Sequence, residues 1–345
     1  MFGNRLKNAR KMKGMSLDEL CLACDRVVSK QALSKYENGL MEPSSTVLIA
    51  LSEALDVNPD YFFKSQKVDL GRLEFRVRKS FSKKKLESIK EYVRYKVEKY
   101  IEIENTLGIK QLPLKKILVK NKEDVILAAK KTRSNWKLGE DAIVNVISIL
   151  EENGIKVIES GKYDGFNGMS CIVDGMPIIV FKYSNYPERD RFTLLHELGH
   201  LILDFDSSFE EKEREQMCHL FASEMLIPRS VFIRILGQSR HSILMDELKN
   251  IQREFGIAIE ALMYKAKDCK IINENLYQSF FIRRNQACVK ESFMQKETPN
   301  RFESLVIRGF SNGVISSSKA AELLDCSISE LKSKDHFCDA SYCCE

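Results

Sequence analysis

The pentapeptide His196-Glu197-Leu198-Gly199-His200 constrains this chain more than any other feature of its sequence. Residues four apart lie on one face of an α-helix, so the two imidazoles can bind one tetrahedral zinc ion. Glu197 lies between them in sequence, where its carboxylate can take a proton from a water molecule that zinc activates. Only five histidines occur in 345 residues, so a chance match to this spacing is rare. The motif predicts a helix that carries a zinc-dependent hydrolytic site.

A catalytic zinc ion needs a third protein ligand and an open position for water. A second helical pattern, which contains Glu215, starts after His200 at a distance sufficient for a turn and a returning helix, so the third ligand can come from it. Phe221 shares the helix face of Glu215 and would bury that face. Four neighbouring side chains are weaker candidates for the metal: Glu211, Glu213, Cys218 and His219.

The runs RFTLLHELGHLIL (191–203) and ExxCxxFASEMLIP (215–228) resemble the ImmA/IrrE family of zinc metallopeptidases. The resemblance covers roughly residues 140–265 and implies an α+β zincin-like metallopeptidase domain. It implies that His196, His200 and Glu215 bind Zn²⁺ and that Glu197 is the general base of a metalloendopeptidase. Cys218 stands where alanine is common in that family, which is a small-residue change.

Short apolar segments before the motif (155–159, 168–175 and 176–182) predict β-strands. Met176–Phe181 has two interpretations. It is either an edge strand that holds the substrate backbone by strand addition or an ordinary buried strand. No residue stands out as the partner of the oxyanion, for which three side chains are equally suitable: Tyr183, Tyr186 and His241.

Residues 3–63 predict five short helices separated by turn signals. Ser16 and Glu19 have the spacing of a capping box, Ser29 caps the next helix, and Thr46 is expected to open the fourth. Pro59 falls in the first turn of the fifth. This segment resembles the helix-turn-helix domain of the Xre/Cro–repressor family, which implies that the chain binds double-stranded DNA.

In that fold the third helix enters the major groove with its N-terminal residues at the base edges. Lys30 and Lys35 suit guanine edges or phosphates, and Gln31 suits adenine. The turn over Ala23–Val28 is about two residues longer than the commonest pattern. The bases that each residue of the third helix contacts therefore depend on how this longer turn presents that helix. The alternative is a helix-turn-helix that contacts only proteins. The predicted DNA-binding residues are Ser29, Lys30, Gln31, Ser34 and Lys35.

The net charge of +5 is unevenly distributed. Residues 1–65 carry +1, residues 66–140 carry +11 and residues 141–345 carry −7. A long basic helix is expected within 64–110, and it has two interpretations: additional phosphate contacts, or a solvated connector or dimerisation helix that makes a homodimer. The predicted domains are 1–65 (helix-turn-helix), 66–135 (basic helical connector), 136–268 (metallopeptidase) and 269–345 (helical C-terminal extension with a flexible tail).

No apolar run is long enough to span a bilayer, and the first residues lack the apolar core of a signal peptide. Ten cysteines in an unexported chain are expected to be reduced thiols. These observations predict a cytoplasmic protein with no membrane partner. The expected fold class is mainly α with a small β-sheet.

The leading hypothesis is a DNA-binding transcriptional regulator with zinc-dependent endopeptidase activity. As the resemblance implies, its substrate would be a transcriptional repressor. One alternative is a regulator in which the metallopeptidase fold is a sensor or scaffold with little turnover, and another is the antitoxin of a toxin–antitoxin pair. The intact Glu197 favours the hydrolase, because a scaffold has no need of a base between its ligands.

Overall fold

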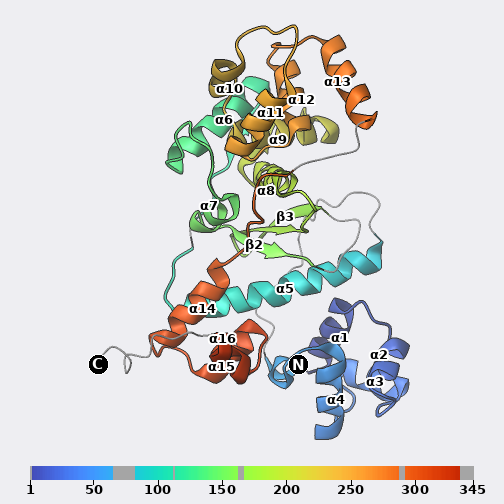
Figure 1. The fold of residues 1–345 in the computed structure, drawn as a ribbon. Coiled ribbons are helices and arrows are strands. Elements are labelled where there is room, and N and C mark those ends of the chain that lie inside the picture. Colours follow the sequence, from blue (N-terminus) through green and yellow to red (C-terminus); the bar gives the residue numbers. More distant parts are fainter. Residues whose placement is uncertain (1, 65–81, 112, 162–166, 287–291, 335–345) are drawn as a thin grey trace. The chain divides into compact units, whose positions relative to one another are not determined.

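The computed structural model describes residues 2–64, 82–111, 113–161, 167–286 and 292–334, and helices dominate them (Figure 1). This confirms the class predicted from the sequence, mainly α with a small β-sheet. The described residues form two compact units: the first holds 2–64, 82–110 and 300–334, and the second holds 111–299 with its gaps. The four predicted domain boundaries remain predictions. The predicted tail from residue 335 and the connector's residues 65–81 lie outside the described residues.

Five short helices open the first unit, as the turn signals predict. Ser16 and Glu19 form the expected capping box, and the hydroxyl of Ser29 accepts a hydrogen bond from the N–H of Ala32. The fourth helix starts before Thr46, because the hydroxyl of Ser44 accepts from the N–H of Val47 and caps it. The five helices are α1 (Phe2–Met12), α2 (Leu17–Ala23), α3 (Lys30–Glu37), α4 (Ser45–Leu55) and the 3₁₀ helix η1 (Pro59–Phe63).

An inward ion pair and a close helix contact fix α3 against α1. Arg10 donates to both carboxylate oxygens of Glu37, at 2.6 and 2.9 Å. A Cβ atom on Gly3 would lie only 2.4 Å from the carbonyl oxygen of Tyr36, so this position requires glycine. Each of the four α-helices contributes a fully buried leucine to the core: Leu6, Leu20, Leu33 and Leu51. A helix as short as α3 is not stable by itself, so these tertiary contacts both stabilise it and fix its position.

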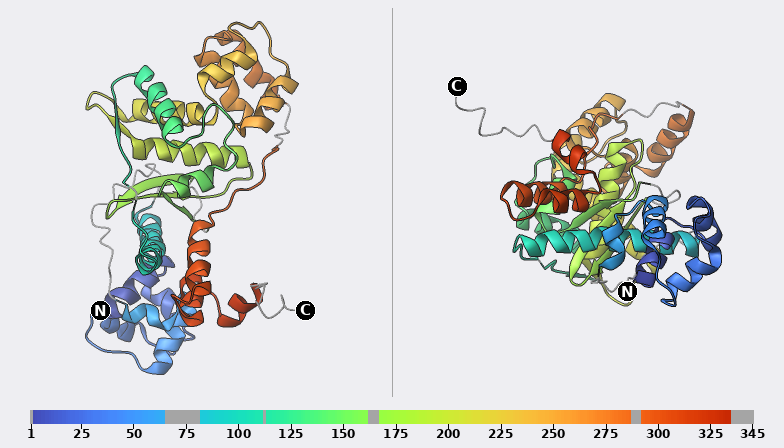
Figure 2. Two further views of the ribbon diagram at one scale, coloured as in Figure 1. Left: turned by 90° about the vertical axis from the view of Figure 1, so that its left-hand side faces the viewer. Right: turned by 90° about the horizontal axis from the view of Figure 1, so that it is seen from below.

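The long helix α5 (Lys83–Thr106) joins the five-helix bundle to three C-terminal helices (Figure 2). Lys99, which is almost completely buried, donates to the carbonyl oxygens of Glu322 and Leu323 at 2.9 and 3.1 Å and pairs with Asp325. Lys64 and Lys319 extend this contact through shared acidic partners. The three helices are α14 (Arg301–Ser311), α15 (Ser317–Leu324) and α16 (Ile328–Lys334).

The second unit contains a three-stranded sheet packed against the helix that carries the His-Glu-x-x-His motif (Figure 1). Its strands are β2 (Lys156–Glu159), β3 (Gly168–Val173) and β4 (Met176–Phe181), in the order β2–β4–β3. β4 runs parallel to β2 and antiparallel to β3, and all its residues are buried. The edge-strand interpretation of Met176–Phe181 is therefore wrong, because β4 is central and β3 is the edge strand beside it.

The motif helix α8 (Pro187–Ile202) and the next helix α9 (Glu211–Leu226) form the middle of this unit. One hydrophobic core joins them to the sheet and to the remaining helices. A second, two-stranded sheet pairs β1 (Ile117–Val119) with β5 (Leu203–Phe205) in parallel. The remaining helices are α6 (Lys122–Asn135), α7 (Val146–Glu152), α10 (Arg229–Leu236), α11 (Met245–Phe255), α12 (Ile259–Asp268) and α13 (Glu274–Gln286).

None of the described helices is long and apolar enough to cross a membrane. The described cysteines carry free thiols, as expected for reduced side chains: Cys21, Cys24, Cys171, Cys218, Cys269 and Cys326.

Candidate metal centre and nucleic-acid interface

A glycine brings the two helices of the metal motif together. A Cβ atom on Gly199 would lie 3.3 Å from the Cα atom of Cys218, so only a residue without a side chain allows α8 and α9 to come this close without a shift. Cys218 is fully buried at this contact. Glu215 lies one turn before Cys218 on α9, and the close approach of the helices therefore places its carboxylate beside His200 of α8.

The ligand atoms of the three predicted metal-binding residues form a small triangle. Nε2 of His196 lies 3.1 Å from Nε2 of His200, and the two nitrogens lie 3.3 and 3.2 Å from the carboxylate oxygens of Glu215. Zinc bonds of about 2.0–2.2 Å place the ligands of a tetrahedral ion about 3.4 Å apart. The spacing and the two-imidazole, one-carboxylate donor set both fit a zinc ion with one position left for water. These three residues are the only such group of side chains within the described part of the chain.

The electrostatics of the triangle favour an ionised carboxylate. Hydrogen bonds from His196 and His200 hold the pKa of Glu215 well below its usual range. Nδ1 of His200 lies 3.3 Å from the sulfur of Cys218, which fixes the orientation of the ring. Nδ1 of His196 is buried without a hydrogen-bond partner among the described residues.

The carboxylate of Glu197 lies against β3. Ser170 donates a hydrogen bond from its hydroxyl to Oε2 of Glu197, at 2.9 Å, and both side chains are buried. A Cβ atom on Gly168 would lie 3.1 Å from Oε1 of the same carboxylate. The motif alone does not reveal these neighbours, because they come from a strand that is distant in sequence.

The weaker metal candidates have other surroundings. Glu211 and Glu213 are exposed, and the carboxylate of Glu213 accepts a hydrogen bond from the N–H of Glu210 at the start of α9. His219 stacks on Phe192, with ring centroids 5.8 Å apart, and its ring lies 4.4 Å from that of His196. Desolvation and the neighbouring His196 lower the pKa of His219. His219 therefore lies beside the triangle and contacts the ring of His196.

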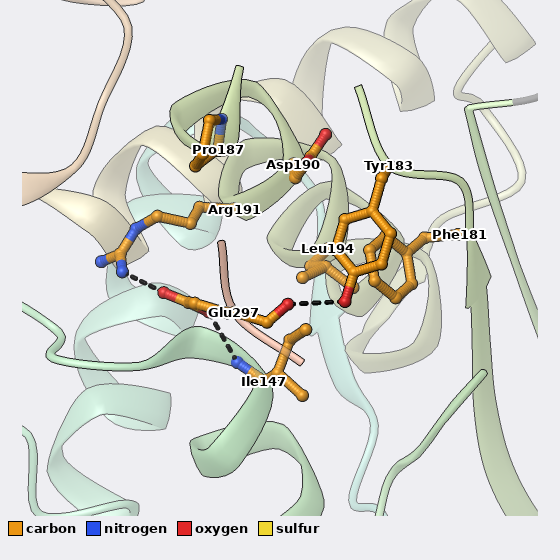
Figure 3. A pocket seen from close by; sticks show the side chains of 8 residues that line it. All are labelled: Ile147, Phe181, Tyr183, Pro187, Asp190, Arg191, Leu194 and Glu297. Atoms are coloured by element: carbon orange, nitrogen blue, oxygen red, sulfur yellow. Dashed lines mark hydrogen bonds and ion pairs between the residues drawn. The ribbon is translucent and has the colours of Figure 1, made fainter. Parts of the chain in front are cut away.

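Of the three tyrosine and histidine candidates for the oxyanion, one is engaged elsewhere. The hydroxyl of Tyr183 donates to the carbonyl oxygen of Glu297 at 2.6 Å (Figure 3). Tyr186 is the N-cap residue of α8, and His241 lies in the segment between α10 and α11. Tyr186 and His241 stay predictions.

A buried polar cluster lies under the N-terminal part of α8, and no motif in the sequence indicates it. Arg191 forms an ion pair with Glu297, and the other oxygen of Glu297 accepts hydrogen bonds from the N–H groups of Val146 and Ile147 (Figure 3). Glu188, also buried, accepts from the hydroxyl of Ser292 at 2.7 Å. The cluster attaches the segment 292–299 to α8. A charged pair this far apart in sequence leaves no local pattern.

The predicted DNA-binding residues follow α3 from its N-cap, Ser29, to its last turn, which contains Lys35. Gln31 and Lys35 are exposed, and Ser34 is partly exposed. Lys30 is exposed too and pairs with Asp18, at 2.6 Å between Nζ and Oδ2. Ser29 is exposed, and its hydroxyl oxygen accepts the capping hydrogen bond from the N–H of Ala32. The turn before α3 contains two successive left-handed residues, Asp25 and Arg26, which account for its extra length.

Fold and site together define a helix-turn-helix protein that also carries a domain with the metal-binding motif of a metallopeptidase. Residues 6–62 match the Helix-turn-helix family model. Residues 150–267 match a peptidase family model described as IrrE N-terminal-like domain. The chain thus combines an Xre-type helix-turn-helix domain with an IrrE/ImmA-like domain, as the two resemblances predict.

One curated relative is similar to part of this chain. It is an uncharacterised HTH-type transcriptional regulator of Rickettsia conorii, 39% identical over 62 residues. The match covers 18% of this chain and 48% of the relative, so this chain spans about half the length of that protein.

Proposed function

We propose that this protein is a DNA-binding transcriptional regulator with zinc-dependent endopeptidase activity, and that its substrate is a transcriptional repressor. The observation that carries the proposal is the triangle of His196, His200 and Glu215 with Glu197 in the same motif. A structural metal site has its coordination closed by protein side chains, whereas three ligands leave a position for water. We expect the protein to act in the cytoplasm, where its DNA target is.

The residues divide the work of hydrolysis between them. The zinc ion would be held by His196, His200 and Glu215. When bound, it would polarise the carbonyl group of the substrate and activate a water molecule for attack on that carbonyl. Glu197 takes the proton of the water at its carboxylate and passes it to the nitrogen of the broken peptide bond. β3 is the outer strand of this sheet among the described residues, and we propose that its outer edge gives backbone hydrogen bonds to an extended substrate segment. Glu197 is thus required for turnover and not for metal binding.

The experiment compares the full chain with the variants Glu197→Gln and Glu211→Gln. Glu211 is exposed on α9 and serves as the matched control for a loss of charge. Each zinc-loaded protein is incubated with a native lysate of its source cells, and new protein N-termini are identified by mass spectrometry. We expect new N-termini from a helix-turn-helix repressor with the wild type and with Glu211→Gln, and none with Glu197→Gln, at equal zinc content.

Cleavage that persists in Glu197→Gln would contradict the proposed mechanism. Equal zinc content without cleavage by any of the three proteins would favour the alternative in which the domain is a sensor or scaffold. That alternative then predicts that zinc removal changes DNA binding by the intact chain.

A further inference from the structure

We propose that β3 positions the general base: the hydroxyl of Ser170 holds the carboxylate of Glu197 in the orientation for proton transfer. The strand whose open edge would receive the substrate thereby also orients the base that acts on it. This inference rests on the proposed function of the α8 site.

The first observation is the hydrogen bond itself. The donor is Ser170 Oγ and the acceptor is Glu197 Oε2, 2.9 Å apart, and both residues are at least nine-tenths buried. A hydrogen bond to an ionised carboxylate is stronger than one between neutral groups, and burial protects it from competing water. Ser170 is held in turn by its register opposite Ile179 on the central strand. The carboxylate of Glu197 is therefore tied to a fixed point of the sheet.

The second observation is the path of the backbone at Gly168. A Cβ atom there would lie 3.1 Å from both Cγ and Oε1 of Glu197, and 2.8 Å from Cγ2 of Thr193. Residues two apart in a strand face the same side, so Gly168 and Ser170 both face α8. Gly168 limits the position of the Glu197 carboxylate by close contact, and Ser170 limits it by a hydrogen bond. Together they restrict the rotation of the Glu197 side chain.

The third observation is the place of β3 in the sheet. The strand order of the sheet is β2–β4–β3, so β3 has no partner strand on the side away from β4 among the described residues. A substrate segment added there would lie along the strand that carries Ser170. A base held in one orientation spends more of its time in the reactive geometry, and a misplacement of about 1 Å can cost about 100-fold in rate. The hydroxyl of Ser170 is therefore expected to affect kcat more than KM.

The kinetic test compares Ser170→Ala, Ser170→Thr and the exposed control Ser207→Ala, all as full-length zinc-loaded protein. The probe is a quenched fluorescent peptide that spans the cleavage sequence found in the lysate. We expect kcat to fall about 10- to 100-fold in Ser170→Ala, with KM within about twofold and zinc content unchanged. Ser170→Thr, which keeps the hydroxyl, should recover most of the rate, and Ser207→Ala should match the wild type.

A second measurement does not depend on activity. Trp136 is the sole tryptophan of the chain and lies in the second unit, so its fluorescence reports the unfolding of that unit. A double-mutant cycle with Ser170→Ala and Glu197→Ala should show a coupling of about tenfold in the unfolding equilibrium constant. Additive effects would overturn the contact and the proposal with it.

The outcomes separate this inference from the proposed function. If Glu197→Gln abolishes cleavage while Ser170→Ala cleaves at the wild-type rate, the positioning role is overturned and the proposed function stands. If Glu197→Gln cleaves at the wild-type rate, Glu197 is not the general base, so the proposed mechanism and the positioning role both fail although the cleavage activity stands. If no variant and no wild-type protein cleaves, the proposed function fails, and the double-mutant cycle alone decides whether Ser170 holds Glu197. A fall in kcat that Ser170→Thr does not reverse would also overturn the role of the hydroxyl.

Discussion

Arg191 and Glu297 form an ion pair although 106 residues separate them in sequence. The Arg191 side chain is 1% exposed and that of Glu297 9%, so water cannot compensate either charge when its partner is removed. Arg191 belongs to the helix of the metal motif, and Glu297 to the segment that leads to α14. The pair therefore connects the stability of the motif helix to a segment far outside the two metal-binding sequences.

The first prediction concerns this pair. Glu297→Ala should lower the free energy of unfolding of the second unit by about 3–5 kcal/mol, because it leaves the guanidinium of Arg191 buried without its ion-pair partner. Urea titration followed by the fluorescence of Trp136 measures the change. The matched control is Glu303→Ala, an exposed glutamate on α14, which should leave this transition unchanged.

A double variant checks the physical reason. If the loss comes from an uncompensated charge, then Arg191→Met with Glu297→Leu should be less destabilised than Glu297→Ala alone, because neither charge of the pair remains without the other. A double variant at least as unstable as the single one would show that the loss comes from packing and not from charge.

The second prediction concerns the third metal ligand. Glu215→Ala should lose most of its zinc on dialysis against a weak chelator, because two imidazoles alone leave the site incomplete. Glu211→Ala, on the same helix but exposed, should keep it. Metal content by mass spectrometry decides the matter. Unchanged zinc in Glu215→Ala would move the third ligand elsewhere.

A related prediction for the metal site is that the charge of Glu215 does not change between pH 8 and pH 5. The pKa of Glu215 is lowered from 4.5 by its two histidine partners, so the carboxylate stays ionised at pH 5 and contributes there as it does at pH 8. Protonation of Glu215 is therefore not the cause of any zinc loss in this range. Glu215→Gln should bind zinc more weakly but lose it over the same pH range.

Local patterns made much of this protein predictable. The capping box at Ser16 and the imidazoles at His196 and His200 are signals within a few residues of sequence, and all appear where they were expected. The predicted start of the fourth helix at Thr46 is wrong by a short shift. Two serines before Thr46 offer the same capping hydroxyl, and Ser44 is the cap in the structure. Helix existence follows from periodicity, whereas the exact first residue depends on competing caps.

The strand order and the buried polar contacts could not be predicted in the same way. β2 and β4 pair in parallel across an intervening strand, and an all-buried strand such as Met176–Phe181 has no alternation that marks it as central or edge. The bond between Ser170 and Glu197 follows from that order. It needed the three-dimensional arrangement, as did the ion pairs that join α5 to the C-terminal helices.

The third prediction concerns this C-terminal contact. Asp325 has a positive φ of 56°, a conformation that asparagine also adopts readily, so Asp325→Asn keeps the turn and removes the charge beside Lys99. We expect a loss of about 1–3 kcal/mol, because Lys99 stays buried while Asp325 is partly exposed. Hydrogen exchange should become faster in α15 and stay unchanged in α8. Glu303→Gln is the matched control, and equal exchange in both variants would contradict the role of the charge.

The fourth prediction concerns DNA. Lys30 and Gln31 lie on the exposed start of α3, so they are placed to contact phosphates and base edges, respectively. On an operator selected from random DNA by the intact protein, Gln31→Ala should cost about 1–3 kcal/mol of binding and relax the preference at one base pair, with little change on random DNA. Lys30→Ala should weaken binding to both DNAs and reduce the salt dependence, because it removes a charge from the interface.

Lys7→Ala, which changes an exposed lysine on α1, is the control, and fluorescence anisotropy at two salt concentrations measures all three variants. If neither α3 variant changes binding while the intact protein prefers its operator, then another surface of the chain reads the DNA, because α3 would have no part in an interface that still discriminates sequence.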